Sequence, residues 1–285
     1  MSRPVVSVIG AGQVGATITA RLAQQELCDL VLYDVIAGMP QGKALDLMEA
    51  GPVDRYSSKI TGSNDISAIA GSSIVVVTAG IARKPGMSRD DLLKINGGII
   101  RIVGESIVKY AKDSIVIVVT NPLDVMAYLM LKTTGFPKQR VLGMAGVLDS
   151  ARFRTFISLE TGVPAGGIDA MVLGGHGDSM VPLLKHTTVN GRQIKDVLPA
   201  ETVEKLVKRT RDGGIEIVNL LKSGSAYYAP GSSAALMAKA ILGDSKAVMP
   251  CSVYLEGEYG LNDVFIGVPV KLGKGGVEEI IKIDL

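Results

Sequence analysis

The sequence predicts an α/β chain in two parts, a doubly wound parallel sheet followed by an α+β part with antiparallel strands. A short apolar run at residues 5–9 leads directly into a glycine-rich turn and an amphipathic helical segment at 16–25. Apolar runs of strand length then alternate with helical segments up to residue 142, which is the pattern of parallel strands joined by crossover helices. After that point the apolar runs are joined by tight glycine turns, which favour antiparallel pairing.

The length and composition fit two domains with a large core. At roughly 150 residues per domain, 285 residues give material for about two. The strand–helix alternation ends near residues 143–146, so we expect one domain over 1–144 and a second over 145–285. Hydrophobic residues make up 47% of the chain, with 34 glycines and no tryptophan, which suits a turn-rich α/β protein.

Charge, hydropathy and cysteine usage exclude several classes of partner. The net charge is +2 without any block of like charges, so we expect no nucleic acid and no membrane surface as a partner. Apolar runs such as 115–119 are far too short to span a bilayer, and a strand beginning at Val5 leaves no room for a signal or transit peptide. Cys28 and Cys251 give neither a disulfide framework nor a metal-ligand pattern. We therefore expect a reduced, cytoplasmic protein without a metal site.

The first turn predicts a dinucleotide-binding Rossmann unit. It has the spacing G-x-G-x-x-G, formed by Gly10, Ala11, Gly12, Gln13, Val14 and Gly15. Glycines allow a tight turn and a close approach to a pyrophosphate, which the helix N-terminus then binds. The second strand, at 30–33, ends in Asp34, close to the offset of about 20 residues expected for the acid that binds the adenosine ribose. The alternatives are a chance glycine turn and an ordinary strand-terminal acid.

The rest of the first half continues the alternation and adds a basic loop. We expect a helix at 42–50, strands at 59–62 and 73–78, and a long helix at 92–110. The segment between the last two carries Arg83, Lys84 and Arg89 and is hinged by glycines, at a strand end where such sheets place lids and ligand groups. It is equally consistent with a solvated surface loop.

The next strand tip offers one further polar candidate. A buried strand at 114–119 is followed by Thr120, Asn121 and Pro122. Asn121 could donate to a substrate oxygen or a cofactor amide, or it could be a turn asparagine before proline. A helix at 123–132 and a short strand at 141–142 complete this half.

The second half has different elements. We expect helices at 147–161, 200–222 and 233–242, and strands at 169–173, 248–256, 263–272 and 277–283. Between them, strands at 181–189 and 192–194 form a hairpin at Asn190-Gly191. His186 lies within this hairpin with no acid at a suitable spacing, so we interpret it as structural.

Three residues of the second half could carry chemistry together. Asp149 and Arg152 are three apart in a helical segment and can project from one face, and His176 lies at a strand end between glycines. An imidazole can exchange the hydroxyl proton, a carboxylate can fix its tautomer, and a guanidinium can bind a substrate carboxylate. Taken alone, these residues are better explained as a surface ion pair and a turn histidine, and only the rest of the chain favours the chemical interpretation.

The chain resembles the lactate/malate dehydrogenase family, and within it the lactate-dehydrogenase-like malate dehydrogenases. The resemblance follows nearly the whole chain in order and spacing, through GAGQVG, the Asp34 strand end, ARKPGMSRDDL, TNPLDV, GVLDSARFR, GGHGDSMVPL, GSAYYAP and YGLNDVFIGVPV. It implies reversible hydride transfer between (S)-malate and NAD in the tricarboxylic acid cycle, by a homo-oligomer, either a dimer or a tetramer. A lactate dehydrogenase or another 2-hydroxy acid dehydrogenase is the nearest alternative. A nucleotide-sensing regulator on the same fold is the non-enzymatic one.

The resemblance also implies roles for particular residues. His176 would exchange the proton, Asp149 would orient it, and Arg89 would polarise the reacting carbonyl. The other substrate contacts would be Arg83, Asn121 and Arg152. Of these, Arg83 would bind a second carboxylate on the substrate. NAD would be held by the glycine turn, Asp34, Asn96, Val119, Thr120 and Asn121. The bond before Pro122 would be cis, and family members usually continue past the last strand into a C-terminal helix, whereas this sequence ends at Leu285.

Overall fold

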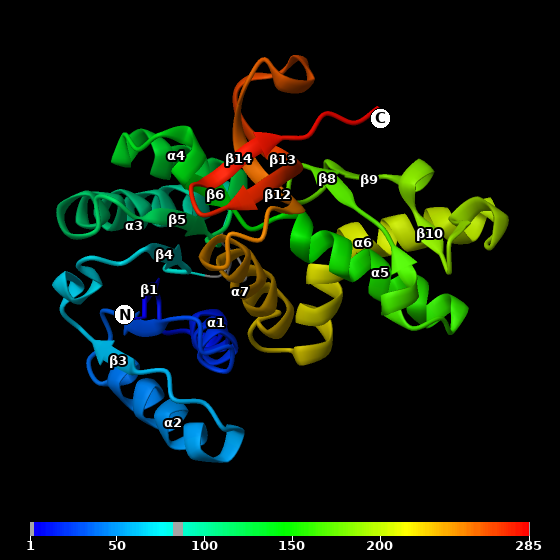
Figure 1. Ribbon diagram of the computed structural model, residues 1–285. Helices are drawn as coiled ribbons and strands as arrows, with labels where there is room; N and C mark the ends of the chain where they lie inside the picture. Colours follow the sequence, from blue (N-terminus) through cyan, green and yellow to red (C-terminus); the bar gives the residue numbers. More distant parts are fainter. Residues whose placement is uncertain (1–2, 82–87, 285) are drawn as a thin grey trace.

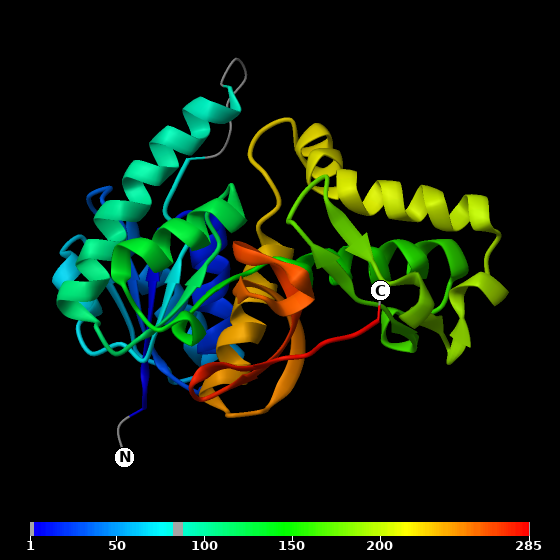
Figure 2. The same cartoon turned by 90° about the horizontal axis from the view of Figure 1, so that it is seen from above.

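The computed structural model describes residues 3–81 and 88–284. Figure 1 shows the parallel sheet and its helices on one side of the molecule and the helices α5 and α6 on the other. Figure 2 shows the same two halves from above, with the last strands between them and the C-terminus beside the second half. Within the described residues, no helix is both long and apolar enough to cross a membrane.

The first half is a parallel sheet in the order β3-β2-β1-β4-β5-β6. Its strands are β1 (Val5–Ile9), β2 (Asp29–Tyr33), β3 (Ile60–Ser63), β4 (Ile74–Val77), β5 (Ile115–Val118) and β6 (Val141–Gly143). Its helices are α1 (Gln13–Ala23), α2 (Met39–Asp54), α3 (Arg89–Tyr110) and α4 (Leu123–Thr134). This strand order is that of the doubly wound dinucleotide-binding fold, as the sequence predicted.

The central strands β4 and β5 are apolar throughout because each contributes side chains to two cores. In β4, Ile74 and Val76 belong to the core under α1 and α7, whereas Val75 and Val77 belong to the core under α3 and α4. All four residues of β4 are buried. Alternate side chains of a strand point to opposite faces, so a strand covered on both sides must be apolar at every position.

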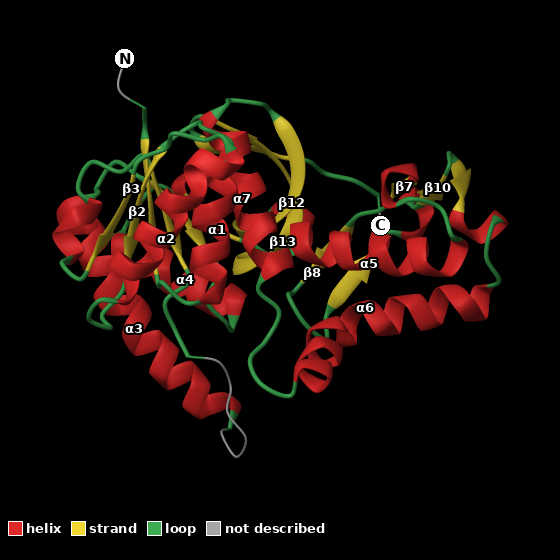
Figure 3. Cartoon of the chain, turned by 90° about the horizontal axis from the view of Figure 1, so that it is seen from below, coloured by secondary structure: helices red, strands yellow, loops and turns green. Residues whose placement is uncertain are grey.

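The second half contains helices and short antiparallel strands. Its helices are α5 (Gly146–Thr161), α6 (Ala200–Leu221) and α7 (Tyr228–Leu242). Its strands are β7 (Ile168–Asp169), β8 (Val172–Gly174), β9 (Met180–Pro182), β10 (Thr188–Val189), β11 (Arg192–Gln193), β12 (Ala247–Glu256), β13 (Asn262–Gly273) and β14 (Gly276–Ile280). Figure 3 shows α7 beside α1 of the first half. The two helices approach so closely that a Cβ on Gly231 would lie 2.6 Å from Thr17 Cγ2.

The antiparallel strands extend the parallel sheet. Ser252 of β12 pairs with Gly143 of β6, and Gly267 of β13 pairs with Gly174 of β8. One sheet of 11 strands therefore runs through both halves, while β11, β10 and β7 form a separate small sheet.

Two predicted strands were wrong in detail. The strand expected at 169–173 is broken into β7 and β8, because Ile168–Asp169 pairs with β10 and Val172–Gly174 pairs with β9 and β13. The strand expected at 181–189 contains a short 3-10 helix, Leu184–His186, between β9 and β10. The turn at Asn190-Gly191 is confirmed, with φ of +48° and +76° at its two residues, as a type I′ hairpin requires.

Both cysteines are free and buried. Cys28 and Cys251 are each 0% exposed. Burial raises the pKa of the Cys28 thiol to about 12 and raises that of Cys251 as well. Both side chains therefore act as small core residues.

Candidate active site

The glycine turn contains glycines with two different functions. A Cβ on Gly15 would lie 1.8 Å from Gly10 O, and one on Gly10 would lie 2.6 Å from Thr78 Oγ1. These two glycines allow α1 to approach the strands. Gly12 has no atom within 4 Å of its Cβ position, and it begins α1 without a side-chain cap. The first N–H groups of that helix are thus available to an anion.

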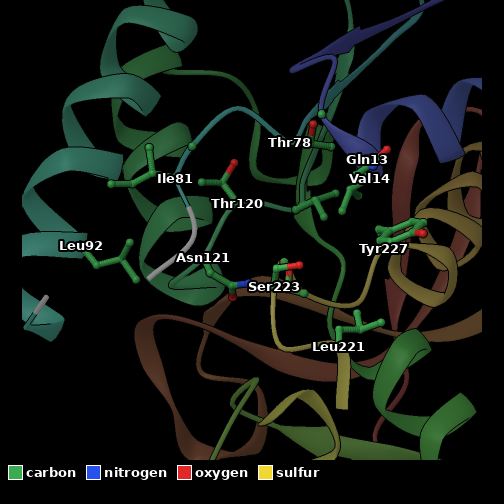
Figure 4. Close-up of a pocket in the computed structure, with 15 residues that line it drawn as sticks. Gln13, Val14, Thr78, Ile81, Leu92, Thr120, Asn121, Leu221, Ser223 and Tyr227 are labelled. Atoms are coloured by element: carbon green, nitrogen blue, oxygen red, sulfur yellow. The ribbon is translucent and has the colours of Figure 1, made fainter. Parts of the chain in front are cut away.

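A cavity of about 790 Å³ lies at this helix N-terminus, a size typical of cofactor sites. Of the predicted cofactor residues, Gly12, Gln13, Val14, Val119, Thr120 and Asn121 line it. Figure 4 shows the residues of the glycine turn, such as Gln13, and those of the strand tip, such as Asn121, around the same cavity. Ser223 and Tyr227, from the segment between α6 and α7, line its other side. Part of that segment is the GSAYYAP motif, to which the sequence assigned no role, and Thr78, Ile81 and Leu92 also line the cavity although no local pattern marks them as site residues. The open helix end, the glycine turn and the size of the cavity together fit a dinucleotide.

Asp34 joins the end of β2 to the glycine turn. Its Oδ2 accepts a hydrogen bond from Ala11 N at 2.7 Å, and its Oδ1 accepts one from Ile36 N at 3.0 Å. An ionised carboxylate has about four acceptor positions, so roughly two remain for a ligand hydroxyl. Asn64, which the sequence analysis did not consider, fixes the same loop by donating to Asp34 O and Ile36 O.

Asn96 shapes the cavity from behind. It is fully buried, and its Oδ1 accepts from Ile81 N at 2.9 Å. Its Nδ2 donates to Ile81 O at 3.1 Å and to Asn121 O at 2.7 Å. Asn96 is not among the residues that line the cavity. Its amide holds two segments that do line the cavity, at Ile81 and at Asn121, and its contact with NAD stays a prediction. The peptide bond between Asn121 and Pro122 is cis, as expected.

The structure brings Asp149, Arg152 and His176 together. Asp149 Oδ2 lies 2.8 Å from His176 Nδ1, and Arg152 Nη1 donates to Asp149 Oδ1 at 3.4 Å. Asp149 is only 2% exposed, which makes these contacts stronger than they would be in water. Burial lowers the pKa of Arg152, while Asp149 raises it; an arginine nevertheless stays protonated. Its Nε is buried without a hydrogen-bond partner among the described residues.

The histidine faces a second cavity that adjoins the first. This cavity measures about 490 Å³, and His176, Asp124 and Ser179 are among its lining residues. It shares Leu92 and Asn121 with the larger cavity. A small molecule beside His176 would therefore lie next to a ligand of the glycine turn's cavity.

The remaining predicted residues are placed elsewhere or lie outside the described residues. Arg83 is outside them, and of Arg89 the structure describes only the backbone, at the start of α3. His186 is exposed and lines neither cavity; its Nε2 lies 3.5 Å from Asp284 O. No group of three His, Cys, Asp or Glu side chains in residues 3–81 and 88–284 could hold a metal ion.

Comparisons with known proteins place this geometry in a family. Residues 5–143 match the lactate/malate dehydrogenase NAD binding domain, and residues 146–285 match the lactate/malate dehydrogenase alpha/beta C-terminal domain. The malate dehydrogenase of Chloroherpeton thalassium is 56% identical over 281 residues, which are 98% of this chain and 91% of that protein. The apo malate dehydrogenase structure from Picrophilus torridus has 48% identity and a TM-score of 0.97, covering 100% of this chain and 91% of that one.

A lactate dehydrogenase is also similar. The structure of the Cryptosporidium parvum enzyme, complexed with lactic acid and β-nicotinamide adenine dinucleotide, has 42% identity and a TM-score of 0.96. It covers 100% of this chain and 92% of that chain. The family models cover both halves of the sequence, and the fold of the whole chain agrees with that of the two solved structures. The chain belongs to the lactate/malate dehydrogenase family.

Proposed function

We propose that this chain is an NAD-dependent malate dehydrogenase, which interconverts (S)-malate and oxaloacetate by reversible hydride transfer. The observation that carries the proposal is the buried Asp149 carboxylate, which contacts His176 at 2.8 Å and Arg152 at 3.4 Å. Imidazole, carboxylate and guanidinium are the groups that oxidation of a 2-hydroxy acid needs beside a hydride acceptor. The 56% identity to a malate dehydrogenase supports malate as the substrate.

His176 exchanges the hydroxyl proton. An ionised Asp149 can only accept hydrogen bonds, so the ring proton lies on His176 Nδ1 and the lone pair on Nε2 can accept a proton. During malate oxidation, Nε2 takes the hydroxyl proton while the hydride leaves C2. The carboxylate then stabilises the imidazolium that forms. In the reverse direction the imidazolium returns the proton to the oxygen of oxaloacetate.

The cofactor residues follow from the larger cavity. Gly12, Gln13 and Val14 at the start of α1 would hold the pyrophosphate, and Asp34 would accept from ribose hydroxyls. Val119, Thr120 and Asn121 would line the nicotinamide side. When bound, NAD supplies the hydride acceptor at nicotinamide C4.

Some of the proposed substrate residues lie within the described part of the chain, and Arg83 lies outside it. Arg152 would bind the carboxylate beside the reacting carbon, Asn121 would donate to the reacting oxygen, and Arg89 would polarise it. Arg83 would bind the second carboxylate of oxaloacetate. Lactate dehydrogenase remains the second candidate because a lactate dehydrogenase matches at 42% identity over the whole chain, and its substrate lacks that second carboxylate.

The first experiment compares His176→Asn with His186→Asn, the only other histidine. We expect His176→Asn to lower oxaloacetate reduction by about 10²–10⁴-fold, the usual contribution of a general acid–base group, while NADH still binds in a fluorescence titration. His186→Asn should behave like the parent. Unchanged turnover in His176→Asn would remove this residue from the mechanism.

A substrate panel then separates the two dehydrogenase candidates. Oxaloacetate, pyruvate and larger 2-oxo acids are each tested with NADH and with NADPH. A preference for oxaloacetate with NADH supports the proposal, and a preference for pyruvate supports a lactate dehydrogenase instead.

Four broader assignments belong to the same proposal. We place the enzyme in the tricarboxylic acid cycle and in the cytoplasm, the latter because free thiols such as Cys28 and Cys251 are typical of reducing compartments. We divide the chain into a cofactor domain at 1–144 and a substrate domain at 145–285.

We also propose a homo-oligomer, a dimer or a tetramer, since large apolar side chains on α2 and α6 are exposed, among them Leu45, Val53, Ile215 and Leu220. Sedimentation equilibrium tests the oligomeric state, and a monomer would contradict it.

A further inference from the structure

The backbone that carries His176 has little conformational preference of its own. The loop after β8 reads Gly174-Gly175-His176-Gly177, and Gly174 and Gly177 have φ of +83° and +147°. Glycine loses more conformational freedom on folding than any other residue. A histidine that must present one ring nitrogen to a substrate therefore needs contacts that fix its main chain as well as its ring.

Two carboxylates hold His176, one at the ring and one at the main chain. Asp149 Oδ2 contacts the ring Nδ1 at 2.8 Å, while Asp124 Oδ2 accepts the backbone N–H of His176 at 3.1 Å. Asp149 belongs to α5 in the second half of the chain. Asp124 belongs to the first turn of α4, directly after the cofactor-facing strand tip at Asn121.

Asp124 is itself fixed by the sheet. Its Oδ1 accepts from Ser252 Oγ at 2.6 Å, and Ser252 is fully buried on β12, opposite Gly143 of β6. Burial raises the pKa of Asp124, whereas the hydrogen bonds from Ser252 and from the His176 backbone lower it. Gly175 lies next to this carboxylate, since a Cβ there would be in van der Waals contact with Asp124 Oδ2 at 3.4 Å.

We propose that Asp124 is a positioning residue, which sets the place of the His176 imidazole relative to the cofactor-facing strand tip. Asn121 lines both cavities, and the helix that carries Asp124 begins two residues later, at Leu123. One carboxylate therefore links the wall of the cofactor cavity, the continuous sheet and the glycine loop. The inference rests on the proposed role of His176, through which Asp124 acts.

The test is a comparison of Asp124→Ala with Asp124→Asn. Asp124→Ala should lower kcat for oxaloacetate reduction by about 10–100-fold, because a displacement of about 1 Å can cost that much. NADH affinity should change by no more than about threefold, since loss of placement affects the chemical step and not cofactor binding. The kinetic isotope effect on kcat with NADH deuterated at the transferred position should rise, because the chemical step becomes rate-limiting.

Asp124→Asn should restore most of the activity. Its amide oxygen can accept the His176 N–H while its NH₂ group donates to Ser252 Oγ. Ser252→Ala removes only one of the two bonds and should give an intermediate kcat, which keeps the test usable even if Asp124→Ala folds poorly.

Asp263→Ala is the matched control. Asp263 also links α4 to the C-terminal strands, by accepting from Tyr128 and Tyr254, but it lines neither cavity. It should lose stability without losing kcat. An unchanged kcat in Asp124→Ala, an equal loss in Asp263→Ala, or an equal loss in Asp124→Asn would each overturn the proposal. Retained turnover in His176→Asn would instead overturn the proposed function, so the two failures are distinguishable.

Discussion

The carboxylate of Asp149 lies 2.8 Å from the imidazole of His176, although the two residues are 27 positions apart in the chain. This contact fixes the tautomer of the ring, so we expect Asp149→Asn to lower kcat without disrupting the fold. An amide NH₂ facing Nδ1 would favour the wrong tautomer, and kcat should fall by at least about 100-fold, as for other acid–base groups. Asp169→Asn, at an exposed acid of β7, is the control. Steady-state kinetics of the two variants check the prediction; equal rates would contradict it.

Substitutions at Arg83 and at Arg152 should distinguish the recognition of the two carboxylates of oxaloacetate. Pyruvate has a methyl group where oxaloacetate has its second carboxylate, so Arg83→Gln should lower kcat/KM for oxaloacetate alone. We expect a loss of at least about 100-fold, or roughly 2.7 kcal/mol, which is within the cost of removing one partner of a buried charge pair. Arg152→Gln should lower kcat/KM for oxaloacetate and for pyruvate alike. A rate within a few-fold of the parent for oxaloacetate in Arg83→Gln would argue against malate as the substrate.

Asp34 should select NAD over NADP. Its carboxylate lies at the end of β2 beside the glycine turn, where it would repel a 2′-phosphate, and the following Val35-Ile36-Ala37 offers no compensating cation. We expect kcat/KM with NADH to exceed that with NADPH, and Asp34→Ser to narrow the ratio. Asp46→Ser on α2 is the control. A parent enzyme that uses NADPH as well as NADH would show that this assignment of Asp34 is wrong.

Substitution by alanine should lower stability at Gly15 and weaken NADH binding at Gly12. Gly15→Ala would place a Cβ 1.8 Å from the backbone oxygen of Gly10, and overpacking of this kind typically costs about 1–3 kcal/mol of the free energy of unfolding. Gly12→Ala meets no atom within 4 Å but adds a methyl group to the cofactor cavity, so it should weaken NADH binding at an almost unchanged Tm. Thermal unfolding and NADH titration of both variants decide; a lower Tm in Gly12→Ala with unchanged binding would contradict this division.

The sequence predicted those parts of the molecule whose signals are local. β4 and β5 were predictable because strands buried on both faces are uniformly apolar, and Asp149 and Arg152 were paired by helical spacing. The break between β7 and β8 was not predictable, since the partner of β7 is β10, which follows two further strands in the chain. Asp124 looks like an ordinary acid in a first helical turn. Only the fold brings it to His176, 52 positions away, and to Ser252, 128 positions away.

The pairing of β6 with β12 has a consequence for how the chain can be divided. Without β12, the strand β6 would be the edge of the parallel sheet, and the backbone of Gly143, which pairs with Ser252, would be open to other chains. A fragment ending at residue 144 would therefore be prone to aggregate even with every parallel strand and the glycine turn intact. The strand β12 thus covers the last parallel strand, and through Ser252 it also holds Asp124 beside His176.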